Sequence, residues 1–158
     1  MNLHEIHPHD FTKTPNFKGA YFTIQKALPL LRPGSSVVIN ASVGARKGWP
    51  TTSTVSTCKA AVIHLARILS AELVGRGIRV NTLSPGPTDT AMFGRFAGEE
   101  QGDAVKGVLA TNNPSKRMAD PSEIAKLAVY LASDDSAYVV GADFLIDGGV
   151  SAISPVGA

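Results

Sequence analysis

Apolar residues recur at the spacing of an α-helix in three segments, residues 10–31, 56–73 and 121–133. Pro15 and Gly19 predict a kink near the start of the first helix. The second helix is predicted to end at the Gly-Arg-Gly that follows it, because glycine readily takes the left-handed conformation of a helix cap. The third segment begins with "DPSE", which is a helix entry signal.

Three short runs lie between and after these helices. The first two predict buried strands, and the third predicts a last strand and its turn. They are residues 36–41, 78–86 and 141–149. Residues 44–54 are predicted to form a loop, and residues 87–119 to be irregular or to form short helices. Alternation of strand and helix is typical of a parallel α/β sheet with right-handed crossovers, so we predict an α/β fold.

The predicted sheet has about three strands, which leaves two edges with unpaired backbone groups. Residues 36–41 are too apolar for an exposed edge strand, so the pattern predicts that part of the sheet is missing. We expect the 158 residues to form one partial domain. Residues 1–9 are expected to be a flexible N-terminal segment, and residues 151–158 a C-terminal tail.

Composition and charge limit the cellular compartments and the classes of partner that we expect for this protein. A hydrophobic fraction of 44% and a charged fraction of 18% describe a globular chain. The net charge is +2 and the basic residues are scattered, so we expect no nucleic-acid partner. The single cysteine, Cys58, fits a reducing compartment. The sequence has no signal peptide and no apolar run of the roughly 18 residues that a membrane span needs, so we expect a cytoplasmic protein without a membrane partner.

Five segments together resemble one known family. They are "NFKGAYFTIQKALPLL", "GSSVVINAS", "STCKAAVIHLARILSAEL", "RGIRVNTLSPGPTDT" and "DPSEIAKLAVYLASDDSAYVVGADFLIDGG". In order and spacing they resemble the second half of the classical short-chain dehydrogenases/reductases, over residues 9–150. The resemblance implies a truncated, Rossmann-like, doubly wound parallel sheet. It also implies an ancestral NAD(P)-dependent oxidoreductase function on a carbonyl or alcohol substrate, whose identity the sequence does not reveal.

The resemblance assigns the candidate catalytic residues. Carried over position by position, the family's catalytic Asn, Ser and Lys correspond to Asn16, Ser42 and Lys59. The catalytic tyrosine falls on Val55. The family uses the tyrosine phenol as a general acid/base and the lysine to lower the pKa of that phenol. Because valine has no proton to give, we expect the isolated chain to be impaired or inactive as a catalyst.

The resemblance also assigns a cofactor site for NAD or NADP. Residues of "SPGPTDT" correspond to the family's nicotinamide loop, and Lys59 to the lysine that holds the ribose. The loop residues are Pro85, Gly86, Thr88 and Thr90. The family's "G-x-x-x-G-x-G" phosphate loop, and the half of the fold that carries it, have no counterpart in this sequence. We therefore do not expect this chain to bind a dinucleotide tightly on its own.

Each candidate residue also has a structural interpretation. Ser42 is also explained as a strand-terminal serine that bonds to nearby backbone. Lys59 is equally compatible with an ordinary solvated lysine near a helix start. Asn16 has a structural use in satisfying the backbone of a kinked helix, and we weigh that use evenly against a catalytic one.

Non-catalytic functions are the main alternatives. By resemblance, the helices at residues 10–31 and 56–74 pair with those of a neighbouring subunit, which predicts a homo-oligomer and an interaction role. The exposed first strand is also able to accept a strand from a partner. A gene fragment, a start-codon error or a deliberately shortened chain is another alternative.

A hydrolase that uses Ser42 is a minor alternative. The "NASVG" segment has Asn40 where a nucleophile elbow needs glycine, and His64 is expected to pack among apolar helix positions. The segment "HEIHPHD" carries His4, His7, His9 and Asp10. Its proline and terminal position prevent a helical pair of ligands, so we predict no metal site.

Overall fold

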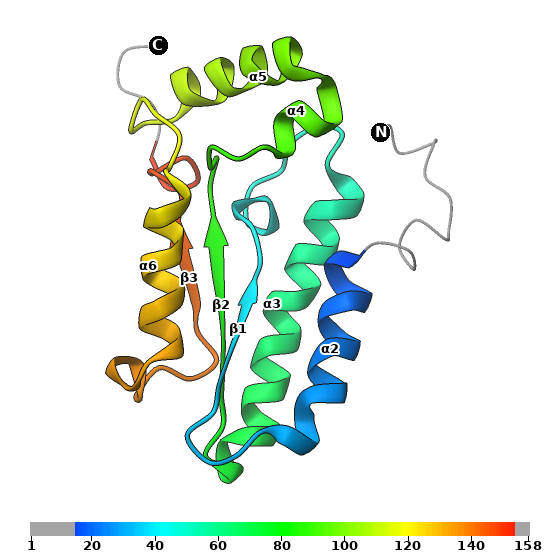
Figure 1. Cartoon of the computed structure of the whole chain (residues 1–158), viewed down its shortest axis with the longest axis vertical. Helices are drawn as coiled ribbons and strands as arrows, with labels where there is room; N and C mark the ends of the chain where they lie inside the picture. The colour runs from blue at the N-terminus through cyan, green and yellow to red at the C-terminus, as the bar shows by residue number, and fades with distance from the viewer. Residues whose placement is uncertain (1–14, 154–158) are drawn as a thin grey trace.

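The computed structural model describes residues 15–153, so the expectation for residues 1–9 lies outside the described residues. Its sheet has three parallel strands in the order β1-β2-β3. They are β1 (Ser36–Asn40), β2 (Arg79–Pro85) and β3 (Asp143–Ile146). The predicted α/β fold is confirmed, and Figure 1 shows the three strands running in one direction between two layers of helix.

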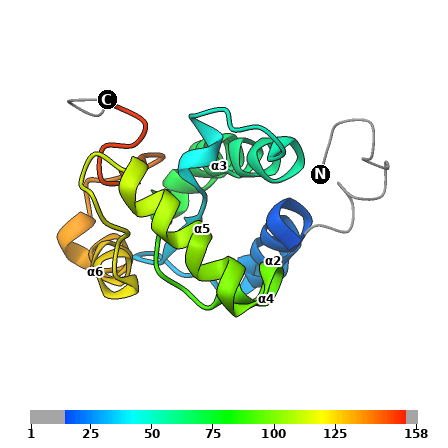
Figure 2. The ribbon, with the colours of Figure 1, turned by 90° about the horizontal axis from the view of Figure 1, so that it is seen from above.

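The helices lie on both faces of the sheet and across one end of it (Figures 1 and 2). One face is covered by η2 (Pro15–Gly19), α2 (Ala20–Ala27), η3 (Leu28–Leu30) and α3 (Ser53–Leu73). The other face is covered by α6 (Pro121–Ala132). The carboxyl ends of the strands are capped by α4 (Met92–Ala97) and α5 (Glu99–Asn112). Ligands of doubly wound folds bind at that end, so this arrangement locates the candidate site.

The main core lies between the sheet and α3. Ile39 and Val80 point from adjacent strands toward Val62 and Ala66 of α3, and all four side chains are buried. The central strand β2 is buried over nearly its whole length, although Arg79, Asn81, Thr82 and Ser84 are polar. In contrast, β1 is only partly buried, because no described strand pairs with its second edge.

Two helix ends are fixed as their sequences predict. At the end of α3, Gly77 has a φ of 70°, the left-handed conformation that the Gly-Arg-Gly predicted. At the start of α6, the Asp120 carboxylate accepts from the Ser122 amide and the Glu123 carboxylate accepts from the Asp120 amide, at 2.8 Å each. These bonds close a capping box.

Two predictions about helices need correction. Residues 87–119 contain α5, which is 14 residues long, and not only short helices. The second helix begins at Ser53, three residues earlier than predicted. The predicted kink near Pro15 and Gly19 is a π-helical turn over Pro15–Gly19, with α2 following directly. Within residues 15–153, no helix is both long and apolar enough to span a bilayer.

Candidate active site

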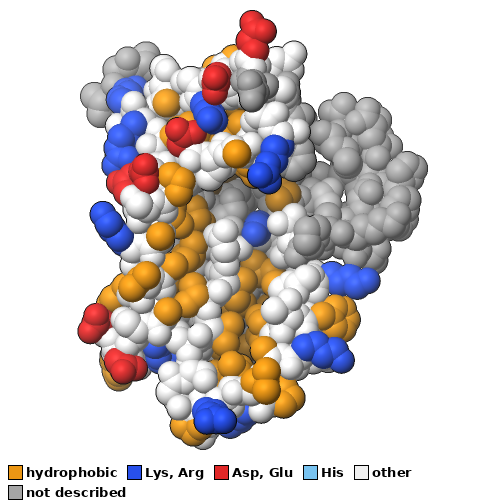
Figure 3. All heavy atoms as spheres, in the orientation of Figure 1, with side chains coloured by type: hydrophobic (Ala, Val, Ile, Leu, Met, Phe, Trp, Pro, Cys, Tyr) orange, Lys and Arg blue, Asp and Glu red, His pale blue; other side chains and the backbone are white. Residues whose placement is uncertain are grey.

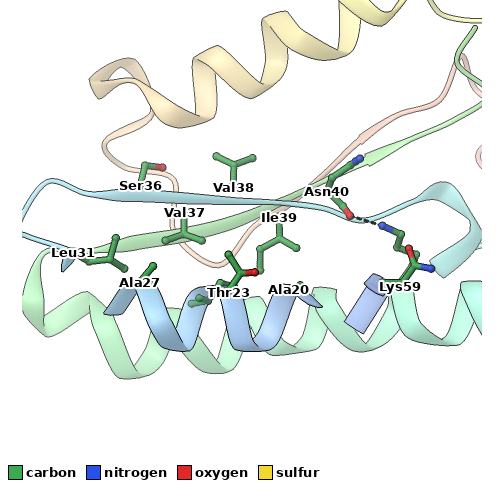
Figure 4. A pocket seen from close by; sticks show the side chains of 12 residues that line it. Ala20, Thr23, Ala27, Leu31, Ser36, Val37, Val38, Ile39, Asn40 and Lys59 are labelled. Carbon is green, nitrogen blue, oxygen red and sulfur yellow. Dashed lines mark hydrogen bonds between the residues drawn. The ribbon is translucent and has the colours of Figure 1, made fainter. Parts of the chain in front are cut away.

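The Lys59 side chain links α3 to the end of β1. Its ammonium donates a hydrogen bond to the backbone oxygen of Asn40 over 2.7 Å (Figure 4). Burial lowers the pKa of the Lys59 amine from its ordinary value, and a smaller effect of Cys58 opposes that shift. The ammonium has three N–H donors and this bond uses one. Two donors are therefore left for a ligand such as a ribose diol.

Asn16 and Lys59 lie at the same cavity, as the resemblance implied. Asn16 belongs to the π-helical turn η2 and Lys59 to α3, and both line a cavity of about 470 Å³ beside β1. The remaining lining residues are uncharged, and most are small or aliphatic. They are Ala20, Thr23, Ile24, Ala27, Leu31, Ser36, Val37, Val38, Ile39 and Asn40. The structure thus brings together two of the three predicted catalytic residues.

Ser42 does not line that cavity. It caps the short helix η4 (Val43–Ala45), where its hydroxyl oxygen accepts from the Gly44 amide over 3.1 Å. A Cβ added at Gly44 would lie 3.4 Å from Ser42 Oγ and 2.9 Å from Ser56 Oγ, so the two hydroxyls flank this glycine. The structure bears out the local backbone bond expected of a strand-terminal serine. The position of the Ser56 hydroxyl beside Gly44 was not predicted from the sequence.

Val55 occupies the first turn of α3, one helical turn before Lys59. Its side chain is 41% exposed. The Ser56 hydroxyl that follows it donates to Thr52 Oγ1 over 2.9 Å. The position that the resemblance assigns to the proton donor is therefore accessible and carries an aliphatic side chain.

The predicted nicotinamide loop follows β2 at the carboxyl end of the sheet. Gly86 packs so closely on Asp147 that an added Cβ would lie 2.6 Å from the Asp147 Cα. The Asp147 carboxylate accepts from Gly149 and Ser151 and fixes the turn after β3. The contact of Gly86 with Asp147 was missed at the sequence level, although "DGG" is a recognisable turn signal. Gly86 thus has a packing role in addition to any cofactor role.

The other loop residues lie near Gly86. The Thr88 hydroxyl donates to the Gly86 backbone oxygen over 3.0 Å, and Pro85 ends the strand itself. Thr90 is half-buried just before α4. Asp89 bonds with Lys106 of α5 over 2.8 Å, which ties the loop to the helices above it. The Gly86 and Asp89 amides donate to backbone oxygens of neighbouring segments, so the threonine hydroxyls are the groups of this loop that suit the carboxamide of a nicotinamide ring.

The hydrolase alternative gains no support from these positions. His64 is the only histidine in the part of the chain that the structure describes, and its side chain is exposed on α3. The expectation that His64 is packed is wrong, because the helix buries Ile63 and Leu65 and turns the residue between them outward. Among residues 15–153, no cluster of three potential metal ligands is present. His4, His7, His9 and Asp10 lie outside the described residues.

The sequence of this chain is similar to those of proteins named as oxidoreductases. A family model described as enoyl-(acyl carrier protein) reductase matches residues 1–151. A Xenopus laevis protein named dehydrogenase/reductase SDR family member 6 is 41% identical over 147 residues, which are 90% of this chain and 60% of that protein. The chain spans 47% to 60% of the length of the first curated relatives that it matches.

Solved structures give the same fold. A short chain dehydrogenase family protein from Francisella tularensis subsp. tularensis SCHU S4 matches with a TM-score of 0.86 and 28% identity, over 96% of this chain and 66% of that one. The landomycin C-6 ketoreductase LanV, solved with bound NADP and rabelomycin, matches with a TM-score of 0.81 and 26% identity. That match covers 96% of this chain and 56% of LanV.

Proposed function

The chain belongs to the short-chain dehydrogenase/reductase family, and on that premise we propose that its site is the nicotinamide end of an NAD(P)-dependent oxidoreductase site. The substrate class is a carbonyl compound or an alcohol. The observation that carries the proposal is the meeting of Asn16 and Lys59 at one cavity, with the Lys59 ammonium anchored on the Asn40 carbonyl. In the classical members that the sequence resembles, these two positions are catalytic.

The cofactor would lie between Lys59 and the loop after β2. The two unused N–H donors of Lys59 fit a ribose, and the hydroxyls of Thr88 and Thr90 fit the carboxamide, since the Gly86 amide and carbonyl are already bonded within the protein. When bound, the nicotinamide supplies or accepts a hydride. NADP is bound in the LanV structure, and for this chain NAD and NADP are both proposed as cofactors.

Turnover by this site is proposed to be impaired. Reduction of a carbonyl needs a proton at the carbonyl oxygen, and general acid catalysis typically contributes 10²–10⁴-fold. Val55 supplies no proton, and Lys59 already donates one of its protons to Asn40. Ser42 donates no hydrogen bond to the described residues and is left as the hydroxyl that orients the substrate oxygen.

The nicotinamide proposal is tested by comparing reduced nicotinamide mononucleotide with NADH and NADPH in amide-detected NMR titrations. We expect the three ligands to shift the same amides, those of Gly86, Thr88 and Thr90. We also expect their dissociation constants to agree within about tenfold, because the adenosine half adds few contacts to these residues. In Thr88→Val the shifts should weaken, whereas the matched exposed control Thr57→Val should leave them unchanged.

Two results would contradict the proposal. Shifts that are absent up to about 10 mM of each ligand would remove the cofactor role from this chain. A dinucleotide that binds more than about a hundredfold tighter than the mononucleotide would mean that these residues hold the adenosine phosphate as well.

A second proposal is that the chain forms a homo-oligomer through α2 and α3, with a structural role in the assembly. Large apolar side chains are exposed on both helices, which lie side by side (Figures 1 and 2). Tyr21 is 41% exposed, Phe22 46% and Ile68 45%. Light scattering should give a dimer or larger species, and Phe22→Arg with Ile68→Arg should dissociate it. A monomer at about 100 μM for the unmodified chain would exclude this assembly.

A further inference from the structure

The short helix that follows Ser42 is closed by its own hydrogen bonds. The Ala45 amide donates to the Ser42 oxygen over 3.0 Å, and the Lys47 amide donates to the Val43 oxygen over 3.1 Å. The Val43 side chain is buried, so η4 packs against the rest of the protein. Because residues 42–47 form one bonded turn, a contact that holds the end of η4 also holds Ser42 at its start.

Arg46 joins the end of η4 to the first residue of β3. Its Nε and Nη2 atoms donate to Asp143 Oδ2 over 2.9 and 2.6 Å. The Thr82 and Ser84 hydroxyls of β2 donate to the other oxygen, Asp143 Oδ1, over 2.7 Å each. The Asp143 side chain is 1% exposed, whereas that of Arg46 is 42% exposed. A carboxylate so far removed from water needs a cation and hydrogen-bond donors, and Arg46 supplies the cation.

The surroundings of the three strands are largely apolar. In the space-filling view, hydrophobic side chains gather between α6 and α2 (Figure 3). An ion pair that is shielded from water is stronger than one at the surface, and the Asp143 carboxylate is shielded in this way. Removal of the cation leaves a buried carboxylate without its charge partner. Asp143 therefore favours the position of η4 in which Arg46 reaches it.

Lys47 makes a second link, to the turn that follows β3. Its ammonium donates to the Val150 backbone oxygen over 2.8 Å and lies 5.4 Å from the centre of the Trp49 ring. Gly86 packs against the same turn, through its close contact with Asp147. Two consecutive basic residues therefore bond to β3 and to the turn that supports the loop after β2.

The main-chain bonds between β1 and β2 end just before Ser42. Among the described residues, the last of them runs from the Ala41 amide to the Leu83 oxygen over 2.8 Å. Beyond that bond, the side chains of Arg46 and Lys47 supply hydrogen bonds from this segment to β3 and the turn after it. The position of Ser42 relative to β3 is therefore sensitive to replacement of these side chains.

We propose that Arg46 is a positioning residue of the candidate site, with Lys47 as a second link. The two side chains fix Ser42 relative to the loop after β2, because both bond to the segment on which Gly86 packs. Reacting groups that come from different strands must be held in a set geometry. The catalytic meaning of this inference rests on the proposed function, whereas the positioning itself is a property of the chain without a ligand.

The Gly44 amide reports the position of Ser42, since it donates to the Ser42 hydroxyl. In Arg46→Gln, hydrogen exchange at Gly44, measured by NMR without a ligand, should be about tenfold faster than in the unmodified chain. Exchange at the Ala66 amide, in the middle of α3, should stay within about twofold. The matched control Arg67→Gln removes an exposed positive charge from α3 and should change neither rate.

Two further variants compare the two links. Arg46→Lys keeps a cation that can donate to Asp143, and should return Gly44 exchange to within about threefold of the unmodified rate. Lys47→Met removes an exposed link and should speed Gly44 exchange by only about threefold. Rescue by the lysine at position 46 would show that the charge holds η4 in place.

Two results without a ligand would overturn the inference. Equal Gly44 exchange in Arg46→Gln and Arg67→Gln would show that the ion pair does not hold η4. Equal acceleration at Gly44 and Ala66 in Arg46→Gln would show that the residue only stabilises the fold as a whole.

A titration with reduced nicotinamide mononucleotide connects the inference to the proposed function. In the unmodified chain, the ligand should shift the amides of Ser42 and Gly86. In Arg46→Gln the Gly86 shift should remain, whereas the Ser42 shift should fall by about half or more, because η4 no longer holds the serine beside the ligand. A Ser42 shift that is unchanged in this variant would overturn the inference. Absence of the Gly86 shift in the unmodified chain would contradict the proposed function alone, and the Gly44 exchange rates would still decide the positioning role.

Discussion

The Lys59 ammonium donates to the Asn40 backbone oxygen over 2.7 Å, and this bond joins α3 to the last residue of β1. The same oxygen belongs to the edge of β1 that faces away from β2, so a side chain of the candidate active site also holds the end of that edge. Its amine is partly removed from water, which disfavours the charged form. The bond explains how the lysine keeps its place although a valine stands one turn before it.

Replacing Lys59 by methionine should remove a rise in stability with pH. The folded-state pKa of Lys59 is lowered, so between that value and the ordinary value the unfolded chain binds more protons. Stability should therefore increase with pH in that interval for the unmodified chain, and less for Lys59→Met. Denaturant unfolding from pH 7 to pH 10 measures the difference. Parallel curves for the two proteins would contradict the lowered pKa.

Arg79 should be one of the most sensitive positions for stability. Its guanidinium is buried and donates to the backbone oxygens of Ser133 and Ser136 over 2.9 Å each, so it ties β2 to the end of α6. Arg79→Met should reduce the unfolding free energy by about 3 kcal/mol, because carbonyl groups are left without donors. The matched control is Arg76→Met, whose exposed guanidinium makes two longer bonds to backbone oxygens and should cost less than about 1 kcal/mol. Equal losses in urea unfolding would refute the assignment.

Gly86 should tolerate no side chain. A Cβ at this position would lie 2.6 Å from the Asp147 Cα and 2.9 Å from its backbone oxygen, and neither strand end is free to move far. We expect Gly86→Ala to lower the unfolding free energy by about 2–3 kcal/mol through overpacking. Gly48→Ala, where nothing lies within 4 Å of the added atom, should be nearly neutral. Thermal unfolding of both variants checks this, and an unchanged midpoint for Gly86→Ala would exclude the packing role.

Because of Glu123, the stability of α6 should fall as the solution is made acidic. Hydrogen bonds from Arg117 and then from the Asp120 amide lower its pKa to about 2. A carboxylate with a lowered folded-state pKa contributes stability above its unfolded value, and loses it as pH falls toward the folded one. The helix signal of the unmodified chain should therefore weaken between about pH 4.5 and pH 2 more than that of Glu123→Gln. Circular dichroism across that range measures it, and identical curves would contradict the shift.

The regular elements were predictable where the spacing of apolar residues was unambiguous. The strand predicted over residues 78–86 is β2 (Arg79–Pro85), and the entry signal of α6 forms the expected capping box. In contrast, α5 was missed because its glycines reduce helix propensity. One of them, Gly102, lies so close to Gly94 of α4 that an added Cβ would be 2.8 Å from the Gly94 nitrogen. That glycine is needed by tertiary packing, which a local pattern does not reveal.

The candidate site was only partly predictable for similar reasons. The resemblance identified Asn16 and Lys59, which do meet at one cavity. The bond from Lys59 to Asn40 involves a backbone oxygen, and backbone contacts leave no trace in residue identity. His64 was placed wrongly because apolar neighbours on both sides obscure the phase of the helix. The outer edge of β1 was predicted from the apolar strand, but the cavity beside it depends on the position of α2.

Val55→Tyr tests whether the missing proton donor is the only deficiency of the site. The introduced phenol would lie one turn before Lys59, so the ammonium should lower its pKa below the ordinary value of about 10. The ultraviolet difference titration of variant against parent isolates that phenol from Tyr21, Tyr130 and Tyr138. We nevertheless expect no NADPH oxidation above the parent with simple aldehydes or ketones, because the 158 residues carry no "G-x-x-x-G-x-G" phosphate loop. Turnover by Val55→Tyr alone would show that these residues bind the cofactor productively, and the expectation of weak dinucleotide binding would then be wrong.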